Sequence, residues 1–308
     1  MALKFLAQGM KSLSLKHVDS LVRDLVKELR RLRKQEPADG YTSENLRQYF
    51  VEQNIYLPEK YYDRGIFSIQ PPDVTVTYMW PGTPIEQLAQ LLRCRLQDDD
   101  KIYLDIFLND QRTGQAITMA VANANVLYMH SPRHVIIISA VEYPTFNDAE
   151  VENGKIFCWI FDRCWCVLEM AIRDCLSVQK LSHQESAILI VGKFAEQLAE
   201  RVKPGETSIT DIIANEFRGI DFFERLQGRP SDVRQIKETL ISPGFFSSTS
   251  HFNEYYRKRM TRLFVENIQQ VISSKRLKLQ NIDLSDILVS FCSIPMIPWI
   301  GSKSVFKA

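Results

Sequence analysis

Trp165 and Glu169, a tryptophan and a glutamate four residues apart, are the residues whose types and spacing point most directly to chemistry. They belong to the stretch WIFDRCWCVLEMAIR (residues 159–173), whose apolar residues predict a helix. Residues four apart share one face of a helix, so we expect the carboxylate among largely apolar neighbours. It costs free energy there unless it is paired or has a function. Glu169 is therefore either a reactive group or the partner of a nearby cation, Arg163 or Arg173.

The segments that would position this helix alternate between short apolar strands and amphipathic helices. The strands are predicted at residues 73–78, 101–108, 134–139 and 187–191, with helices at 84–96 and around 165–169. Strands that are apolar on both faces indicate a parallel sheet with helices on both sides. We therefore predict an α/β fold with a flavodoxin-like parallel sheet of four or five strands, over residues 73–225. Ligands bind such sheets beyond the carboxyl ends of the strands, where Tyr78, Asn109 and Ser139 lie.

Helical extensions are predicted on both sides of this region. A Leu/Val stripe predicts a helix over residues 16–35, and a second helix is predicted over 43–54 with Thr42 or Ser43 as its cap. The predicted division is a helical arm and linker (1–72, with the linker from 57), an α/β domain (73–257), and a C-terminal helix with an apolar tail (258–308). The smaller predictions are a last strand at 219–222, a polar loop after residue 139 and an N-cap at Asp162.

Composition excludes several classes of function. The net charge is +1, so no overall field favours a nucleic acid as partner. No run of 18 apolar residues predicts a membrane span. The six cysteines match no zinc-ligand spacing, so we expect buried thiols in a reducing, cytoplasmic compartment and no metal. There is no G-x-G-x-x-G motif and no Walker loop for a bound nucleotide cofactor.

The order of several motifs points to one family. Residues 73–78 read DVTVTY, 103–111 read YLDIFLNDQ, and 165–169 form W-x-x-x-E, while 219–221 read GID. In this order, the region of about 73–257 resembles a divergent toll/interleukin-1 receptor (TIR) domain, of the kind found in microbial eukaryotes and bacteria. The Arg-Asp-x-x-Pro-Gly loop of animal receptor TIR domains is missing here. The resemblance therefore does not extend to receptor-adaptor signalling of the animal type.

The resemblance implies a chemistry for Glu169. Many TIR domains cleave the nicotinamide–ribose bond of NAD, and the glutamate of W-x-x-x-E is their catalytic residue. Such cleavage passes through an oxocarbenium-like state that one carboxylate stabilises, and nicotinamide leaves as a neutral base. NAD would be the substrate, with no further cofactor. The candidate substrate-binding residues are Tyr78, Trp80, Asp105, Asn109 and Trp165. Three of these also have a structural alternative: Trp80 as an aromatic that anchors its loop, Asp105 bonded to a backbone amide or an arginine, and Trp165 packed in the core under the site.

Two other functions stay open. A TIR-like domain can be a non-enzymatic scaffold in signalling or defence that self-associates into homo-oligomers through its surface helices. It can also be a module that binds a nucleotide signal without cleaving it. The surroundings of Glu169 separate these alternatives. A Glu169 beside an open cleft favours the enzyme or the nucleotide-binding module, and a Glu169 locked to an arginine favours the scaffold.

Overall fold

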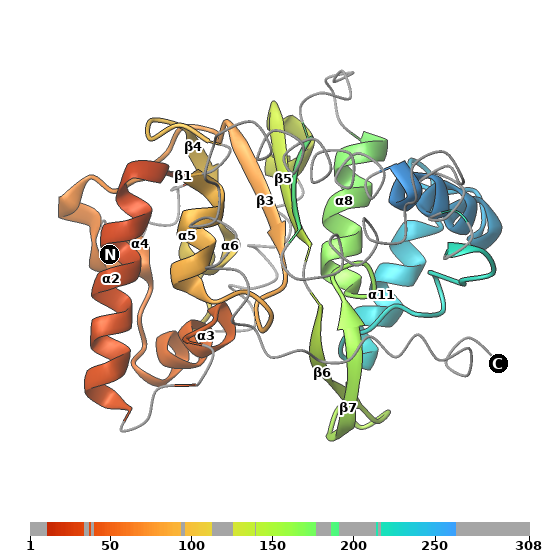
Figure 1. Cartoon of the computed structure of the whole chain (residues 1–308), viewed down its shortest axis with the longest axis horizontal. Coiled ribbons are helices and arrows are strands. Elements are labelled where there is room, and N and C mark those ends of the chain that lie inside the picture. Colours follow the sequence, from red (N-terminus) through yellow and green to blue (C-terminus); the bar gives the residue numbers. More distant parts are fainter. Residues whose placement is uncertain are drawn as a thin grey trace, which may run out of the picture.

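The computed structural model describes residues 11–33, 37, 40–93, 96–112, 126–138, 140–176, 186–190, 214 and 217–262. These residues form a mixed α/β structure built on a six-stranded sheet with the order β2-β1-β4-β3-β5-β8 (Figure 1). Its strands are β1 (Ser12–Ser14), β2 (Phe67–Ser68), β3 (Val74–Tyr78), β4 (Lys101–Tyr103), β5 (Arg133–Ile138) and β8 (Ser186–Ile190).

The middle of the sheet is parallel, as the apolar strands predict. β4, β3, β5 and β8 run in one direction, with Val76 of β3 opposite Val135 of β5. Every residue of β3 is buried, which fits a strand with helices near both of its faces. In Figure 1, α2 (Leu15–Leu32) and α5 (Ile85–Arg93) lie on one side of β3. On its other side lie α8 (Cys164–Leu176) and α11 (Pro230–Leu240).

The second parallel strand is shorter than its apolar run predicts. The expected strand over 101–108 ends at Tyr103, and α6 (Asp105–Leu108) follows it. The carbonyl of Leu104 accepts hydrogen bonds from the N–H groups of Phe107 and Leu108 at 3.0 and 3.1 Å, which closes a helical turn. The prediction that Asp105 lies inside a strand is therefore wrong. Asp105 lies just beyond the carboxyl end of β4, and its own carboxylate accepts the N–H of Ile106.

Three other predicted elements differ in the structure. The polar loop expected after residue 139 is instead an antiparallel hairpin of β6 (Ala140–Phe146) and β7 (Glu152–Trp159). Residues 219–222 form turns rather than a last strand. Asp162 is not the cap of α8, because its carboxylate accepts the Trp159 N–H and pairs with Arg225 at 3.0 Å. The Asp162–Arg225 ion pair joins residues 63 positions apart, which local composition does not reveal.

The N-terminal segment packs onto the sheet. The predicted helix over 16–35 is α2, and the Leu/Val stripe is buried from Val18 to Leu29, whereas Leu32 at the end of the helix is exposed. The helix predicted over 43–54 is α3 (Ser43–Glu52), capped at Thr42, whose backbone N–H donates to Asn45 at 2.9 Å. Where a linker was expected at 57–72, the chain forms α4 (Leu57–Lys60), the 3-10 turn η1 (Tyr62–Arg64) and β2. β1 pairs with both β2 and β4, so this segment extends the sheet.

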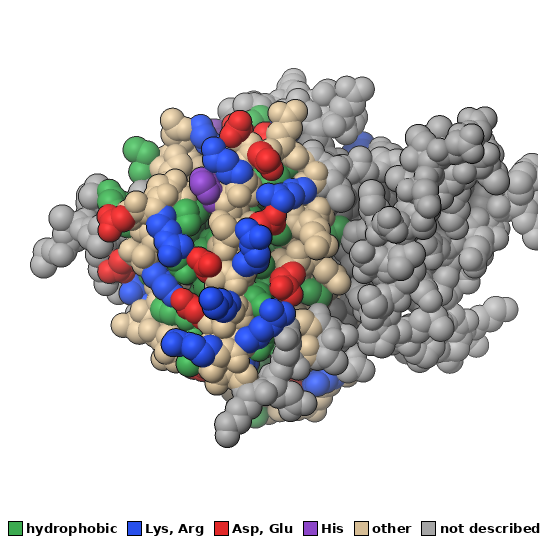
Figure 2. All heavy atoms as spheres, turned by 60° about the vertical axis from the view of Figure 1, so that its left-hand side comes forward, with side chains coloured by type: hydrophobic (Ala, Val, Ile, Leu, Met, Phe, Trp, Pro, Cys, Tyr) green, Lys and Arg blue, Asp and Glu red, His purple; other side chains and the backbone are tan. Residues whose placement is uncertain are grey.

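The outer side of this segment carries charges of both signs. Figure 2 shows lysines and arginines interspersed with aspartates and glutamates on this face. Several of them are paired, including Lys60 with Glu28 at 2.7 Å and Arg64 with Asp24 at 2.9 Å. No large field of one sign covers the face in this view, in line with the net charge of +1.

We expect Val26→Ala in α2 to lower the free energy of unfolding by about 2 kcal/mol. The valine is 1% exposed, so the substitution removes two buried methyl groups and leaves a cavity. Chemical denaturation measures the loss. Lys27→Ala, on the exposed side of the same helix, is the control and should change stability by less than about 0.5 kcal/mol. Equal, small effects at both positions would contradict the packing of α2 on the domain.

Towards the C-terminus, α11 is followed by a second helical stretch over residues 249–262. Most of the C-terminal helix and apolar tail predicted over 258–308 lies outside the described residues. No helix in the described part of the chain is both long and apolar enough to cross a membrane.

Candidate functional site

Glu169 projects from α8 towards the first parallel strand. Its Oε2 accepts a hydrogen bond from the Thr77 hydroxyl of β3 at 2.7 Å. Among the described residues, no lysine or arginine forms an ion pair with it. Of the two cations considered as partners, Arg173 donates to backbone carbonyls of residues 128–132. The guanidinium of Arg163 instead lies 3.8 Å from the centre of the Tyr143 ring. Glu169 is therefore not locked to an arginine in the described part of the chain.

The surroundings of Glu169 favour its protonated form. Burial, reinforced by the negative charge of Asp105, raises the pKa of Glu169 to about 8. The Thr77 and Tyr128 hydroxyls and the more distant Arg163 charge oppose that rise in pKa. The residue keeps partial contact with solvent even though protein surrounds most of it. At pH 7 most molecules therefore hold a proton on this partly exposed carboxyl group.

Asp105 is the second carboxylate of the site, and Trp80 holds it in place. The indole Nε1–H of Trp80 donates to both Asp105 oxygens, at 3.2 and 3.0 Å. Trp80 lies two residues beyond β3 and Asp105 two residues beyond β4, so two neighbouring carboxyl ends meet here. Burial raises the pKa of Asp105 to about 6, against the lowering effect of the Trp80 and Ile106 N–H groups. Asp105 thus loses its proton before Glu169 as the pH rises.

The remaining predicted site residues are held by neighbours. Tyr78 is the last residue of β3 rather than part of the following loop, and it is only 4% exposed. Its hydroxyl lies 3.0 Å from the Ser43 hydroxyl of α3. The amide oxygen of Asn109 accepts the Tyr103 hydroxyl at 2.9 Å. Trp80 and Asn109 keep partial exposure, so they are more accessible to a ligand than Tyr78.

Trp165 is anchored away from β3. Its indole N–H donates to Asp232 of α11 at 3.1 Å. Glu169, one helical turn later, points instead to Thr77 of β3. Trp165 is partly exposed and packs against the buried core. Its contacts fix α8 against α11, as expected for a packing residue.

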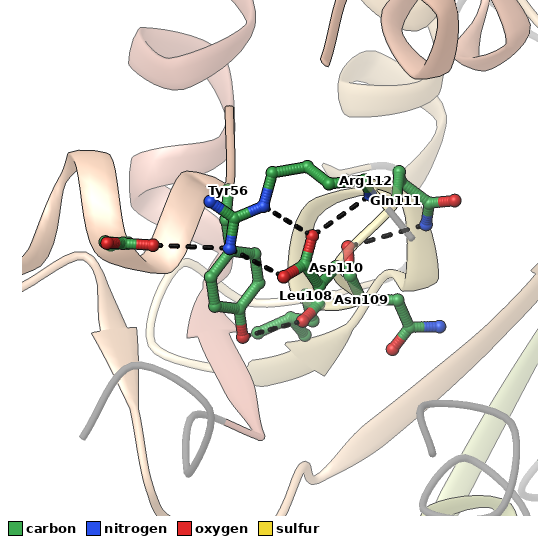
Figure 3. Close-up of polar contacts among 7 residues, drawn as sticks. Tyr56, Leu108, Asn109, Asp110, Gln111 and Arg112 are labelled. Carbon is green, nitrogen blue, oxygen red and sulfur yellow. Dashed lines mark hydrogen bonds and ion pairs between the residues drawn. The ribbon is translucent and has the colours of Figure 1, made fainter. Parts of the chain in front are cut away.

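A second polar cluster fixes the loop that follows α6 (Figure 3). Arg112 pairs with Asp110 at 2.7 Å and with Glu59 of α4 at 3.3 Å. Tyr56 donates its hydroxyl to the Leu108 carbonyl at 3.3 Å, and Arg112 lies above its ring. These contacts tie the segment carrying Asn109 to α4, close in sequence to Asp105.

Several residues of the site were missed by sequence reasoning. Thr77 bonds Glu169, Tyr128 and His134 contact the Thr77 hydroxyl, and Asp110 with Arg112 fixes the neighbouring loop. The strands that contain Thr77 and His134 have no unusual sequence pattern, so only their hydrogen bonds in the folded protein distinguish these two residues. The polar run NDQRTG at 109–114 was the one available signal for the loop cluster.

The described residues contain no group of three His, Cys, Asp or Glu side chains placed to hold a metal ion. The cysteines at 158, 164 and 166 are buried free thiols, and Cys175 is partly exposed. Burial raises the pKa of Cys158 and of Cys164 to about 12, so these two thiols are poor nucleophiles near neutral pH.

In comparisons with family models, with curated proteins and with solved structures, nothing matched this chain. The resemblance to TIR domains and the function that it implies therefore remain predictions. The geometry by itself provides a partly exposed carboxyl group bonded to a buried threonine. It also provides a second carboxylate and an indole at the carboxyl ends of parallel strands.

Proposed function

We propose that this protein cleaves the bond between nicotinamide and ribose in NAD or a related nucleotide, with Glu169 as the catalytic carboxylate. The observation that carries the proposal is the state of Glu169. It is partly exposed, it is bonded to Thr77, and no described cation neutralises it. A carboxylate in that position can stabilise positive charge that develops on a bound sugar.

The strand order supports a ligand site here. In chain order, the parallel strands lie as second, first, third and fourth. This order is consistent with the flavodoxin-like arrangement that we propose, in which ligands bind near the first and third strands, where the strand order reverses. Those strands are β3 and β5, and Thr77 belongs to β3. We infer that the carboxyl ends of β3 and β5 form one wall of the substrate site.

The charge of the substrate fits two acidic groups. Nicotinamide in NAD is a cationic pyridinium, and it leaves as a neutral base once its bond to C1′ of the ribose breaks. The bonding electron pair goes to the ring nitrogen, so the positive charge moves onto the ribose. Ionised Glu169 would stabilise that charge, and Asp105 would add to the negative field. Trp80, held by Asp105, offers a partly exposed aromatic surface for a base.

The expected pH dependence follows from the raised pKa of Glu169. Since the carboxylate is the active form, kcat/KM should rise with pH, reach half of its plateau at about pH 8 and level off about one pH unit higher, as kcat/KM reports the free protein. At pH 7 it should be about a tenth of the plateau. Asp105→Asn removes the charge that repels the Glu169 carboxylate, so the pKa of Glu169 should fall. The rise of kcat/KM in this variant should therefore occur at lower pH. A rise at the same pH in that variant would contradict this coupling.

The direct test is to incubate the purified protein with NAD and measure free nicotinamide, at several protein concentrations and at pH 7 and 9. Release that depends on Glu169 supports the proposal. If no nicotinamide is released but NAD binds, the nucleotide-binding alternative is favoured. If the protein neither cleaves nor binds NAD and only self-associates, the scaffold alternative is favoured.

A further inference from the structure

His134 lies at the end of a hydrogen-bonded chain that begins at Glu169. Its Nε2 is 3.0 Å from the Thr77 hydroxyl oxygen, which in turn is 2.7 Å from Glu169 Oε2. Thr77 and His134 are both 0% exposed and come from the neighbouring strands β3 and β5. An imidazole is costly to bury, since its Nδ1 has no hydrogen-bond partner among the described residues. The buried Nδ1 destabilises the fold, so a role of His134 is to be sought in its hydrogen bond to Thr77.

The hydrogen bonds from His134 through Thr77 to Glu169 can run in only one direction when Glu169 is ionised. Burial, with the charges of Arg259 and Arg173, lowers the pKa of His134 well below its usual range. The imidazole is therefore neutral and carries a single N–H. The one hydroxyl hydrogen of Thr77 must be donated to the carboxylate, so the Thr77 oxygen can only accept from His134. His134 must then carry its hydrogen on Nε2, and its Nδ1 is bare.

We propose that Thr77 and His134 are positioning residues for Glu169, with His134 Nε2–H donating to Thr77 and Thr77 donating to Glu169 Oε2. The arrangement occupies Oε2 and leaves Oε1 to face the ligand. When Glu169 is protonated, the same direction places its proton on Oε1. The reverse direction would put a hydrogen on Nδ1, a buried N–H group without an acceptor. The catalytic consequence rests on the proposed function, whereas the direction of the chain does not.

Other groups also contact the three residues of this hydrogen-bonded series or interact with them electrostatically. Asp105 of α6 repels the Glu169 carboxylate, and Arg163, at the start of α8, attracts it. The Tyr128 hydroxyl lies 3.5 Å from the Thr77 hydroxyl and donates to the Val76 carbonyl at 2.8 Å. The Tyr128 ring also meets His134 edge-on, with centroids 5.6 Å apart. None of these contacts supplies a hydrogen bond to His134 Nδ1.

The direction of these hydrogen bonds can be measured without an activity assay. Nitrogen NMR of ¹⁵N-histidine-labelled protein separates the two tautomers, and His134→Asn identifies the signals of this residue. We expect Nε2 to be protonated and Nδ1 bare from pH 6 to 9, with no change of tautomer as Glu169 ionises. A protonated Nδ1 at either end of this range would overturn the proposal.

Variants at Thr77 test the positioning. Thr77→Val keeps the shape but removes the donor to Glu169, so the pKa of Glu169 should rise by about one unit. Thr77→Ser should restore it. Thr75→Val is the matched control, since Thr75 is equally buried on the same strand but bonds the Arg133 carbonyl at 3.5 Å. Carbon NMR of labelled glutamate carboxyl groups reads these pKa values, and an unchanged value in Thr77→Val would refute the inference.

If the protein releases nicotinamide, Thr77→Val should lower kcat/KM at pH 7 about tenfold and move its rise to higher pH, while Thr77→Ser stays close to the unmodified protein. Activity that Thr77→Val leaves unchanged would remove the positioning role while keeping the proposed function. If His134 carries its hydrogen on Nε2 but the protein never cleaves NAD, the direction of the hydrogen bonds is confirmed and the proposed function is rejected. If Thr77→Val does not fold, the tautomer measurement on the unmodified protein still decides.

Discussion

Glu169→Gln should lower NAD cleavage by about a hundred- to a thousandfold while the fold is retained. The amide has nearly the same shape, and its oxygen can still accept the Thr77 hydroxyl. It cannot carry the negative charge that stabilises the developing charge on ribose, and losing one such contact typically costs on the order of 3–4 kcal/mol of transition-state stabilisation. The substrate affinity should fall less, because that charge on ribose is absent in the ground state.

The measurement is nicotinamide release under single-turnover conditions, with circular dichroism to verify the fold. Glu238→Gln, on the exposed side of α11, is the matched control and should retain full activity. Undiminished cleavage by Glu169→Gln would remove the residue from the mechanism. An unmodified protein that is inactive even when concentrated would favour the scaffold or the nucleotide-binding module.

The same variant has an expected effect on stability. The folded-state pKa of Glu169, about 8, lies above the usual value of 4.5. Between these pH values the folded protein holds a proton that the unfolded chain has lost, so the contribution of Glu169 to stability falls as pH rises through this window. Gln does not ionise. Glu169→Gln should therefore be at least as stable as the unmodified protein at pH 9, which separates a loss of chemistry from a loss of fold.

Arg173→Met should destabilise the protein by about 4 kcal/mol. Arg173 is only 5% exposed and reaches from α8 to the turn before β5. Its guanidinium donates to the carbonyls of Tyr128 at 3.5 Å, Pro132 at 3.0 Å and Ser131. Methionine keeps the apolar stem but leaves those carbonyls without their donor, at about 1–3 kcal/mol for each buried group. The turn that orients His134 and Tyr128 should loosen as well.

Urea denaturation tests this expectation through a lower midpoint at an unchanged slope. Arg234→Met is the control, because Arg234 is exposed on α11, and it should change stability by less than about 0.5 kcal/mol. A small effect at Arg173 would mean that water or other donors replace the guanidinium at these carbonyls. The proposed catalytic role of Glu169 does not depend on the result.

Local patterns were sufficient where one short segment contains the whole cause of its structure. The buried stripe of α2, the cap at Thr42 and the β-branched run of β3 each depend on neighbours in sequence. Where a local pattern suits more than one structure, prediction failed. The apolar residues 104–108 suit either a strand or a helix, and the hydrogen bonds of the folded chain place them in α6. The β6–β7 hairpin depends on cross-strand pairing that a polar composition does not reveal.

The sequence by itself determined several of the elements, such as α2, α3 and β3, and one reactive candidate, since apolar periodicity and a W-x-x-x-E pattern are local properties. It also indicated that Tyr78 and Asn109 lie near carboxyl ends of strands, but it placed Asp105 inside a strand. Only the tertiary structure decided what surrounds Glu169. Thr77 is 92 residues away in sequence, and Trp80 reaches Asp105 across 25 residues. Their hydrogen bonds and charges set the protonation of the site, because electrostatic interactions depend on distance in space rather than along the chain.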